Sequence, residues 1–301
     1  MIVLRADTLG VCRGVRRALA IVEQAIAENP GVPIYTLGPL IHNPRVVEEF
    51  RSRGVVPIEN ISQAREGIVI VSAHGIGPGL VEECGERGVR VIDATCPDVR
   101  RIQRMVREYA AGGCHVLIVG DANHREVIGI RGWAAGSSVI ASVEEAERVE
   151  LPAECIVVGQ TTFKRAEYRA ICEVLKRRLP GITVFDTSCA STETRQRSLL
   201  SLAQRVEALL VVGGRESANT RWLYQTALQT GKPSWHIEGA AEIPGELSRF
   251  GSVGISAGAS TPDEVIDEVE ESLLALSGSS GHSASAESRP RGGGTAFGRS
   301  P

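Results

Sequence analysis

The sequence lacks a surplus of basic charge, a long apolar run and a recognisable targeting segment. Its 33 Lys and Arg are outnumbered by 36 Asp and Glu, giving a formal net charge of −3, which argues against general nucleic-acid binding. No apolar stretch approaches the about 20 residues that a membrane-spanning helix needs. The N-terminus enters a short apolar run without the basic and apolar regions of a signal peptide. We therefore expect a cytoplasmic protein that binds neither nucleic acid nor membranes.

Two missing motifs narrow the chemistry. The 7 cysteines stand at wide spacings and form no CxxC or zinc-ribbon pattern. Disulfides are not expected in a reducing compartment, so metal binding, catalysis or burial has to explain each cysteine. The GxxxxGK[ST] loop that cradles nucleotide phosphates is absent as well. A phosphate-bearing ligand would need other donors.

Short β-branched apolar runs alternate with amphipathic stretches along most of the chain. The runs that predict strands are Ile68–Ser72, Val89–Ile92, Val116–Val119, Cys155–Val158, Thr183–Phe185, Leu209–Val212 and Ser252–Ser256. The stretches that predict helices are Arg16–Glu28, Val99–Ala111, Lys164–Arg178 and Glu193–Glu207. Strands separated by helices of this length indicate parallel βαβ units, so the predicted class is α/β.

One short motif recurs three times and predicts a repeated fold. Asp93-Ala94-Thr95-Cys96 and Asp186-Thr187-Ser188-Cys189 each follow an apolar run, and the looser Asp7-Thr8-Leu9-Gly10-Val11-Cys12 opens the chain. Two other kinds of strand end recur with a similar spacing. The first kind supplies His42, His124 and Asn219, and the second supplies His74, Thr161 and Ser260. Ligands of open α/β sheets bind at the carboxyl ends of the strands, so three copies of one unit predict a shared site near a pseudo-threefold axis.

The repeats also predict the domain organisation. Residues 1–13 form an N-terminal strand and the first cysteine loop, followed by α/β lobes at 14–97, 98–190 and 191–276. Residues 277–301 are rich in Ser and Gly and poor in apolar side chains, which predicts a disordered tail.

The three repeat cysteines, Cys12, Cys96 and Cys189, are candidate metal ligands. Thiolates are the usual protein ligands of iron–sulfur clusters, and three of them would leave the fourth iron of a cubane open to substrate. Their spacing alone does not distinguish iron–sulfur from zinc. The remaining cysteines are interpreted as small buried hydrophobes, two in strands (Cys114, Cys155) and two in helices (Cys84, Cys172).

Neutral hydrogen-bond donors at the repeat positions predict an anion site. Imidazole, hydroxyl and amide groups can all donate, and the candidates are His42, His74, His124, Ser217, Asn219 and Ser260. Glu126 follows His124 by two residues; a glutamate beside a bound anion and an apolar wall would be held partly protonated, as a general acid should be. The alternative is an exposed glutamate at a helix N-terminus.

Nine motifs occur in the order typical of one family. They are Gly10-Val11-Cys12-Arg13-Gly14-Val15, Gly38-Pro39-Leu40-Ile41-His42-Asn43-Pro44, Ser72-Ala73-His74-Gly75, Asp93-Ala94-Thr95-Cys96-Pro97, His124-Arg125-Glu126-Val127, Gly159-Gln160-Thr161-Thr162, Asp186-Thr187-Ser188-Cys189, Ser217-Ala218-Asn219-Thr220 and Ala257-Gly258-Ala259-Ser260. On these motifs the ordered part of the chain resembles the LytB/IspH family of 4-hydroxy-3-methylbut-2-enyl diphosphate reductases.

The resemblance implies a trefoil of three α/β lobes around a central [4Fe–4S] cluster, with the three repeat cysteines as ligands and one open iron. It implies reductive dehydroxylation of an allylic alcohol diphosphate to isopentenyl and dimethylallyl diphosphates, the last step of the non-mevalonate isoprenoid pathway. Glu126 would deliver protons and Thr161 would order the substrate hydroxyl. The diphosphate would be held by His42, His74, His124, Ser217, Ala218, Asn219 and Ser260. Electrons would come from a ferredoxin- or flavodoxin-type donor.

The chain departs from the family pattern at a few positions. Ala218 stands where many relatives carry a second serine, Trp222 where a basic residue is common, and Arg13 where a small or apolar residue is common. These changes affect the expected affinity for the diphosphate more than the expected reaction.

Two other functions fit parts of the pattern. A zinc enzyme, for example a hydrolase, would use the same Cys and His residues, although no H-E-x-x-H motif or close ligand pair occurs. A non-catalytic α/β module that binds a phosphorylated metabolite would need neither the three cysteines nor Glu126.

Overall fold

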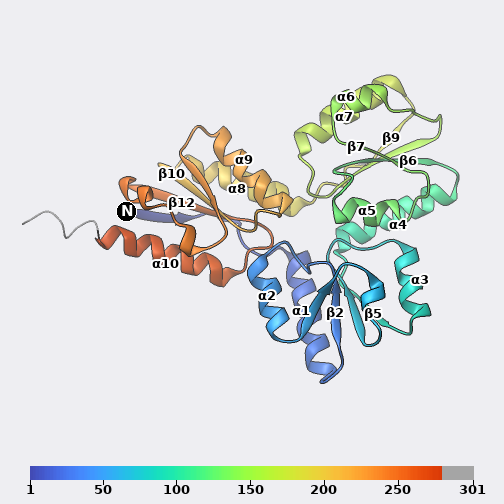
Figure 1. The fold of residues 1–301 in the computed structure, drawn as a ribbon. Helices are drawn as coiled ribbons and strands as arrows, with labels where there is room; N and C mark the ends of the chain where they lie inside the picture. Colours follow the sequence, from blue (N-terminus) through green and yellow to red (C-terminus); the bar gives the residue numbers. More distant parts are fainter. Residues whose placement is uncertain (280–301) are drawn as a thin grey trace, which may run out of the picture.

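A computed structural model of the chain describes residues 1–279 and shows three α/β lobes (Figure 1). Each lobe contains one four-stranded sheet, and all strand pairs in the three sheets are parallel. The predicted class, three α/β lobes with parallel sheets, is confirmed. Within the described residues no helix has both the length and the apolar character that a membrane crossing requires.

The first lobe is built on the sheet β3-β2-β4-β5. Its strands are β2 (Ile34–Leu37), β3 (Val55–Ile58), β4 (Ile68–Val71) and β5 (Arg90–Asp93), and its helices are α1 (Arg13–Glu28), α2 (Pro44–Ser52) and α3 (Pro78–Glu86).

The second lobe repeats this order as β7-β6-β8-β9. Its strands are β6 (His115–Val119), β7 (Ser138–Ile140), β8 (Cys155–Gly159) and β9 (Thr183–Val184). Its helices are α4 (Pro97–Ala111), α5 (Arg125–Arg131), α6 (Val143–Arg148) and α7 (Arg165–Arg178).

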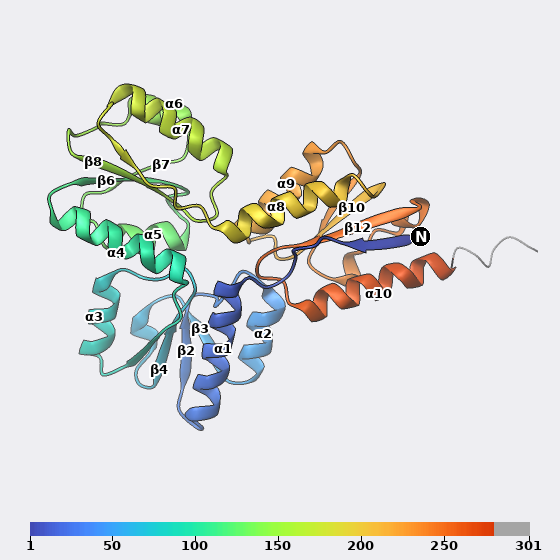
Figure 2. The ribbon, with the colours of Figure 1, turned by 180° about the vertical axis from the view of Figure 1, so that it is seen from behind.

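The third lobe has the order β11-β10-β12-β1, so its last strand comes from the other end of the chain. Its strands are β10 (Ala208–Val212), β11 (Ser234–Ile237), β12 (Ser252–Ala257) and β1 (Ile2–Arg5), and its helices are α8 (Ala190–Ala203), α9 (Ala218–Gln229) and α10 (Asp263–Ser279). Figure 2 shows β1 beside β12, while α1, which follows β1, lies in the first lobe.

In every lobe the fourth strand of the sheet leads through a cysteine into a helix of the next lobe. After Cys96 the chain enters α4, whose Ile102 packs with the core of the second lobe. After Cys189 it enters α8, which packs in the third lobe, and after Cys12 it enters α1, whose Ala18 packs in the first. The three predicted ligand cysteines therefore stand at the three crossovers between lobes.

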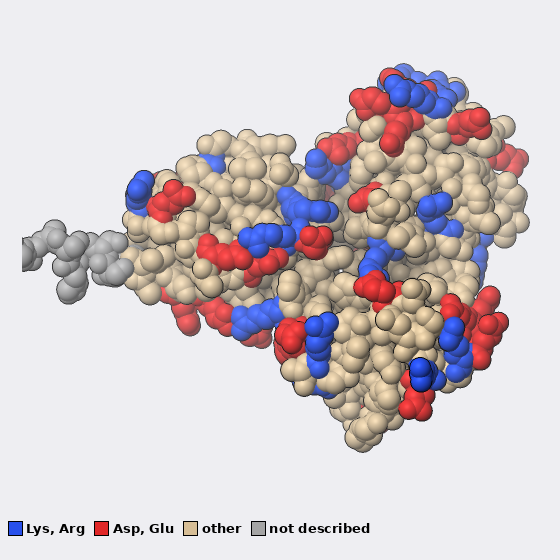
Figure 3. All heavy atoms as spheres, viewed as in Figure 1, with Lys and Arg blue, Asp and Glu red and all other residues tan. Residues whose placement is uncertain are grey.

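Each sheet is buried on both faces, as expected for parallel strands covered by helices. Six clusters of buried apolar side chains fill the space between sheets and helices, two in each lobe. Each cluster lies inside one lobe, so none of the six spans the place where the three lobes meet. On the face drawn in Figure 3, acidic and basic side chains are interspersed.

Most predicted elements are present, with shifted ends. The helix predicted at Glu193–Glu207 is α8, which begins directly after Cys189 and ends at Ala203, because the chain turns there to enter β10. α10 continues to Ser279, past the predicted start of the tail, and the rest of the tail prediction, 280–301, lies outside the described residues. The boundaries drawn between the lobes remain a prediction.

Candidate active site where the lobes meet

A single cavity brings together side chains from all three lobes. It is lined by the three repeat cysteines, by Glu126 and Thr161, and by all seven residues predicted to hold the diphosphate. In chain order these are Cys12, His42, His74, Cys96, His124, Glu126, Thr161, Cys189, Ser217, Ala218, Asn219 and Ser260. The sequence prediction of one shared site therefore corresponds to an observed cavity, while the role of each residue remains a prediction.

The three cysteines have equivalent backbone environments. Each one is the residue that caps the N-terminus of the following helix. The N–H of Cys12 donates to Ala259 O at 3.0 Å, that of Cys96 to Ala73 O at 3.0 Å, and that of Cys189 to Thr161 O at 2.9 Å. The same type of hydrogen bond, to the loop after the neighbouring strand, thus sets the position of each thiol.

The helix N-termini place backbone N–H groups near the sulfurs. Cys12 Sγ accepts a hydrogen bond from Val15 N at 3.4 Å. The sulfurs of Cys96 and Cys189 form no such capping hydrogen bond, but the N–H groups of the first turns of α4 and α8 are close enough to act on their charge. Burial raises the pKa of both thiols, and these N–H groups oppose that shift because they favour the thiolate. The first helical turns therefore suit anionic sulfur ligands.

The surroundings of Gly14 fit a group held between thiols. A Cβ added at this glycine would lie 2.7 Å from Cys96 Sγ and 3.8 Å from Cys12 Sγ. Any side chain here would therefore collide with Cys96 Sγ and be in van der Waals contact with Cys12 Sγ. All three cysteines are free and half-buried, and this donor set is the one that iron–sulfur clusters use.

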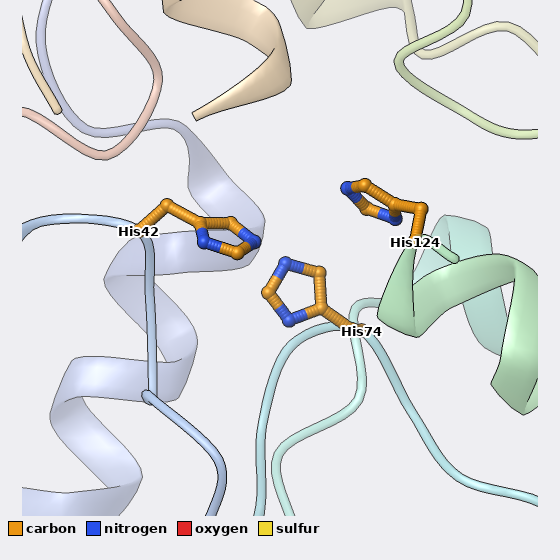
Figure 4. A group of neighbouring side chains, drawn as sticks. All are labelled: His42, His74 and His124. Carbon is orange, nitrogen blue, oxygen red and sulfur yellow. The ribbon is translucent and has the colours of Figure 1, made fainter. Parts of the chain in front are cut away.

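Three histidines face one another in the same cavity (Figure 4). The ring centroids of His42 and His74 are 4.7 Å apart, those of His74 and His124 are 5.5 Å apart, and those of His42 and His124 are 5.9 Å apart. Burial lowers the pKa of all three, that of His124 to about 4, and the proximity of the other imidazoles adds to the effect for His74 and His124. The three rings are therefore neutral near neutral pH.

The hydrogen bonds of His124 determine which of its nitrogens can donate. Its Nδ1 accepts from Glu126 N at 3.2 Å, so the proton of the neutral ring is on Nε2. His74 Nδ1 lies 3.2 Å from Ser72 Oγ. His42 Nε2 is buried and has no hydrogen-bond partner. A ligand that accepts hydrogen bonds would satisfy these rings.

The same histidines are close enough to share a metal ion. One ring nitrogen from each lies within 4.8 Å of the others. In the part of the chain that the structure describes, the cysteine thiols form no group of this kind. That separation argues against one ion bound by all three thiols and suits a cluster with several irons.

Glu126 is a buried carboxyl with a raised pKa. Its side chain is 2% exposed, so the alternative interpretation as an exposed helix-terminal glutamate is wrong. Burial raises the pKa of Glu126 to about 7, while two hydrogen bonds from Thr161 oppose the shift and the nearby Asp98 carboxylate adds to it. Thr161 N donates to Oε1 at 2.6 Å and Thr161 Oγ1 donates to Oε2 at 2.8 Å. This carboxyl can exchange a proton near neutral pH.

The third lobe contributes polar groups that lack partners. Both amide atoms of Asn219 are buried and form no hydrogen bond, although leaving such groups unpaired costs about 1–3 kcal/mol each. Ser217 caps α9, and Ser260 Oγ donates to His42 O at 3.3 Å, which joins the third lobe to the first. Ala218 also lines the cavity but offers only a methyl group. Asn219 thus needs a ligand that can both donate and accept hydrogen bonds, or an accepting ligand together with a water molecule that donates to its amide oxygen.

Several residues of the site were not predicted. Val15, Ile41 and Val99 form an apolar wall of the cavity, and Ser191 and Thr192 line it from the first turn of α8. Four of them stand two or three residues after a repeat cysteine and Ile41 directly precedes His42, and these positions were the available signal.

The other four cysteines lie outside the cavity. Cys84, Cys155 and Cys172 are buried, in α3, β8 and α7. The burial and the elements predicted for these three are confirmed. Cys114 is only half-buried and directly precedes β6, so the prediction of a buried strand residue was wrong there.

The sequence model of the family described as LytB protein matches residues 3–274. The chain belongs to the LytB family. A relative from Treponema denticola, named 4-hydroxy-3-methylbut-2-enyl diphosphate reductase, is 42% identical over 288 residues, which cover 91% of this chain and 99% of that protein. A relative of the same name from Caldanaerobacter subterraneus is 39% identical, with 92% and 98% of the two chains covered.

Solved structures of LytB-type reductases have the same fold. The structure described as the E-1-hydroxy-2-methyl-but-2-enyl-4-diphosphate reductase from Plasmodium falciparum superposes with a TM-score of 0.84 at 26% identity, covering 92% of this chain and 88% of that one. A second structure, described as (E)-4-hydroxy-3-methyl-but-2-enyl diphosphate reductase, the terminal enzyme of the non-mevalonate pathway, has a TM-score of 0.70 at 34% identity. It covers 91% of this chain and 100% of that one.

Proposed function

We propose that this LytB-family chain is a 4-hydroxy-3-methylbut-2-enyl diphosphate reductase. The reaction replaces the allylic C–O bond with a C–H bond: two electrons and two protons enter, water leaves, and the products are isopentenyl and dimethylallyl diphosphates. This is the last step of the non-mevalonate isoprenoid pathway. The observation that carries the proposal is the convergence of three thiols, a protonatable buried carboxyl and a ring of neutral donors on one cavity.

In this proposal Cys12, Cys96 and Cys189 hold a [4Fe–4S] cluster with one open iron. When bound, the cluster supplies electrons and an iron that acts as a Lewis acid toward the leaving oxygen. The close approach of Gly14 to two of the sulfurs and the N–H groups at each thiol support this assignment. We propose that the electrons come from a ferredoxin- or flavodoxin-type protein in the cytoplasm.

The diphosphate binds among donors that carry no charge of their own. The donors that line the cavity are His42, His74, His124, Ser217, Asn219 and Ser260. A bound diphosphate would accept hydrogen bonds from His124 Nε2 and from the unpaired amide of Asn219. Its negative charge would raise the pKa of the imidazoles, which opposes the effect of burial. Held in this way, the diphosphate fixes the allyl group against the thiols.

Thr161 and Glu126 form a proton path to the substrate hydroxyl. The Thr161 hydroxyl donates a hydrogen bond to the ionised Glu126 carboxyl, and its oxygen can still accept hydrogen bonds. A substrate hydroxyl can therefore donate to Thr161 Oγ1 and be oriented by it. When Glu126 is protonated, the chain of hydrogen bonds runs in the opposite direction and delivers a proton to the leaving oxygen. A carboxyl with a pKa of about 7 suits this role because it can give up a proton and regain it at neutral pH.

Metal and sulfide analysis, followed by turnover, tests the proposal. Protein purified without oxygen should contain about four iron atoms and about four acid-labile sulfides per chain. With a reduced dye as electron source, it should convert the allylic alcohol diphosphate to products that keep the diphosphate. Zinc without sulfide, together with release of phosphate, would favour the zinc-hydrolase alternative. Binding of the diphosphate without turnover, in protein that holds no metal after reconstitution, would favour the binding module.

A further inference from the structure

Arg195 is a buried guanidinium whose hydrogen-bond partners are all neutral. It lies in α8 and is 3% exposed. Its Nη2 donates to Gly10 O at 2.5 Å, and its Nη1 donates to Ser191 O at 3.2 Å and to Ser191 Oγ. Its Nε is buried without a partner. Arginine is almost never fully buried unless its charge is paired, so this cation needs an explanation.

The guanidinium connects two of the cysteine loops. Gly10 stands two residues before Cys12, and Ser191 stands two residues after Cys189. Burial lowers the pKa of Arg195, and the negative charge of the Cys12 and Cys189 thiolates opposes that shift. The thiolates are therefore the anionic groups that act on Arg195.

The threefold repeat shows that packing does not require a cation at this place. Arg195 is the sixth residue after its cysteine, and the equivalent residues of the other two lobes are Ala18 and Ile102. Both are fully buried apolar side chains in the cores of their lobes. The repeat is therefore broken on one side of the thiol set only, and a positive charge stands where the other lobes have hydrocarbon.

An acidic group lies on the same side. Asp98 Oδ2 is 3.7 Å from Cys189 Sγ, and the Asp98 carboxylate also acts on Glu126. Negative charges from Asp98, from ionised Glu126 and from the thiolates would all oppose the addition of an electron at this place. Arg195 is a buried cation that interacts with the thiolate of the same cysteine, Cys189.

We propose that Arg195 is the fixed counter-charge of the cluster site and raises the reduction potential of the cluster. The inference rests on the cluster proposed above. One electron from the external donor adds one negative charge to the thiolate-bound cluster, and a buried cation nearby stabilises that reduced state more than the oxidised one. No bond forms or breaks at Arg195 and no proton moves there, so it acts as a positioning and tuning residue.

The test is a redox titration of the holoenzyme and of three variants purified without oxygen. R195M removes the charge and keeps an unbranched side chain, whereas R195K keeps the charge and loses the planar guanidinium. Q103M is the matched control, because Gln103 is also a buried polar side chain on a helix that donates to a backbone carbonyl, Ile76 O at 3.3 Å. Iron and sulfide are measured first, and the potential is then read from the spectroscopic signal of the reduced cluster.

The expected result is a more negative potential in R195M, with the potentials of R195K and Q103M close to that of the wild type. With a donor of fixed potential, kcat of R195M should fall while its KM for the diphosphate stays unchanged. An intact cluster with an unchanged potential in R195M would overturn the inference.

If R195M does not retain iron, its potential cannot be measured, and R195K then distinguishes a role of the positive charge from a role of the guanidinium hydrogen bonds. Retention of the cluster and its potential in R195K would support a role for the charge. Loss of iron in R195K as well would mean that the guanidinium only clamps the two loops, and would overturn the inference. A wild-type protein without iron and sulfide would overturn the proposed function, and this inference with it.

Discussion

Replacing Glu126 with glutamine should lower activity and raise stability at the same time. E126Q keeps the size of the side chain. In the wild type, Thr161 N donates to Glu126 Oε1 at 2.6 Å, and the amide oxygen of the glutamine can still accept this hydrogen bond. It removes the exchangeable proton. General acids contribute about a hundredfold to ten-thousandfold to turnover, so kcat should fall by about that factor.

The effect on stability follows from the raised pKa. The unfolded carboxyl has a pKa of 4.5 and the folded one about 7. Below pH 4.5 both are protonated and the shift has no effect on stability; the penalty grows between these values and is complete above about pH 7. At 1.36 kcal/mol per unit, the charged carboxyl costs about 3 kcal/mol of folding free energy at alkaline pH. E126Q removes this penalty, so its stability relative to the wild type should increase with pH.

Two assays check the prediction. Steady-state turnover is measured across pH: wild-type kcat should decline above about pH 7 as Glu126 loses its proton, and the residual activity of E126Q should lack this decline. Denaturant unfolding of both proteins is compared at about pH 5 and about pH 8. The control is E147Q, because Glu147 is exposed on α6 and should change neither quantity.

The two outcomes that would refute the reasoning are separate. Unchanged turnover in E126Q would remove Glu126 from the proton path. A stability difference between E126Q and wild type that is the same at both pH values would mean that the pKa of Glu126 is not raised.

Three other substitutions test the site. Replacing any one of Cys12, Cys96 and Cys189 with serine should abolish turnover and reduce the iron content. The control C84A changes a buried cysteine outside the cavity and should keep both turnover and iron. Equal iron content in all these variants would contradict the ligand assignment. G14A should also lose iron, because the new methyl group would lie 2.7 Å from Cys96 Sγ, and iron analysis with an unchanged result would show that the thiols do not need this approach. N219D places a carboxylate where the diphosphate is expected and should raise KM by about tenfold or more, given the about 1–3 kcal/mol of a buried polar group; a wild-type KM would place the diphosphate elsewhere.

The site was predictable because its residues repeat, whereas its energetics were not. Three cysteines after three strands are visible in the sequence, and ligands of open α/β sheets bind at the carboxyl ends of the strands. The pKa of Glu126 depends on its burial and on Thr161, 35 residues further along the chain. Arg195 gave no signal at all, because an arginine on an amphipathic helix is normally exposed.

The strands missing from the predicted ranges are β2, a central strand of the first sheet, and one edge strand of each sheet. β3, β7 and β11 each stand at one edge, contain three or four residues, and are partly exposed. Half-exposed strands lack the continuous apolar run that marks the buried central strands. β3 even contains Pro57, which edge strands tolerate and central strands do not.

The exchange of β1 into the third sheet determines when the site can exist during synthesis. Cys12 is made first, but its N–H is held by Ala259 and its strand pairs with β12, so its position is set only when that segment has left the ribosome. In a nascent chain with only two finished lobes, Cys12 is not yet held in position. Holding it requires β1 to pair with β12, and this contact closes a loop that contains most of the chain. Cluster loading on the proposed enzyme is therefore a step that follows synthesis of β12, and a truncation that removes β12 and Ala259 would also release Cys12, the first ligand in the chain.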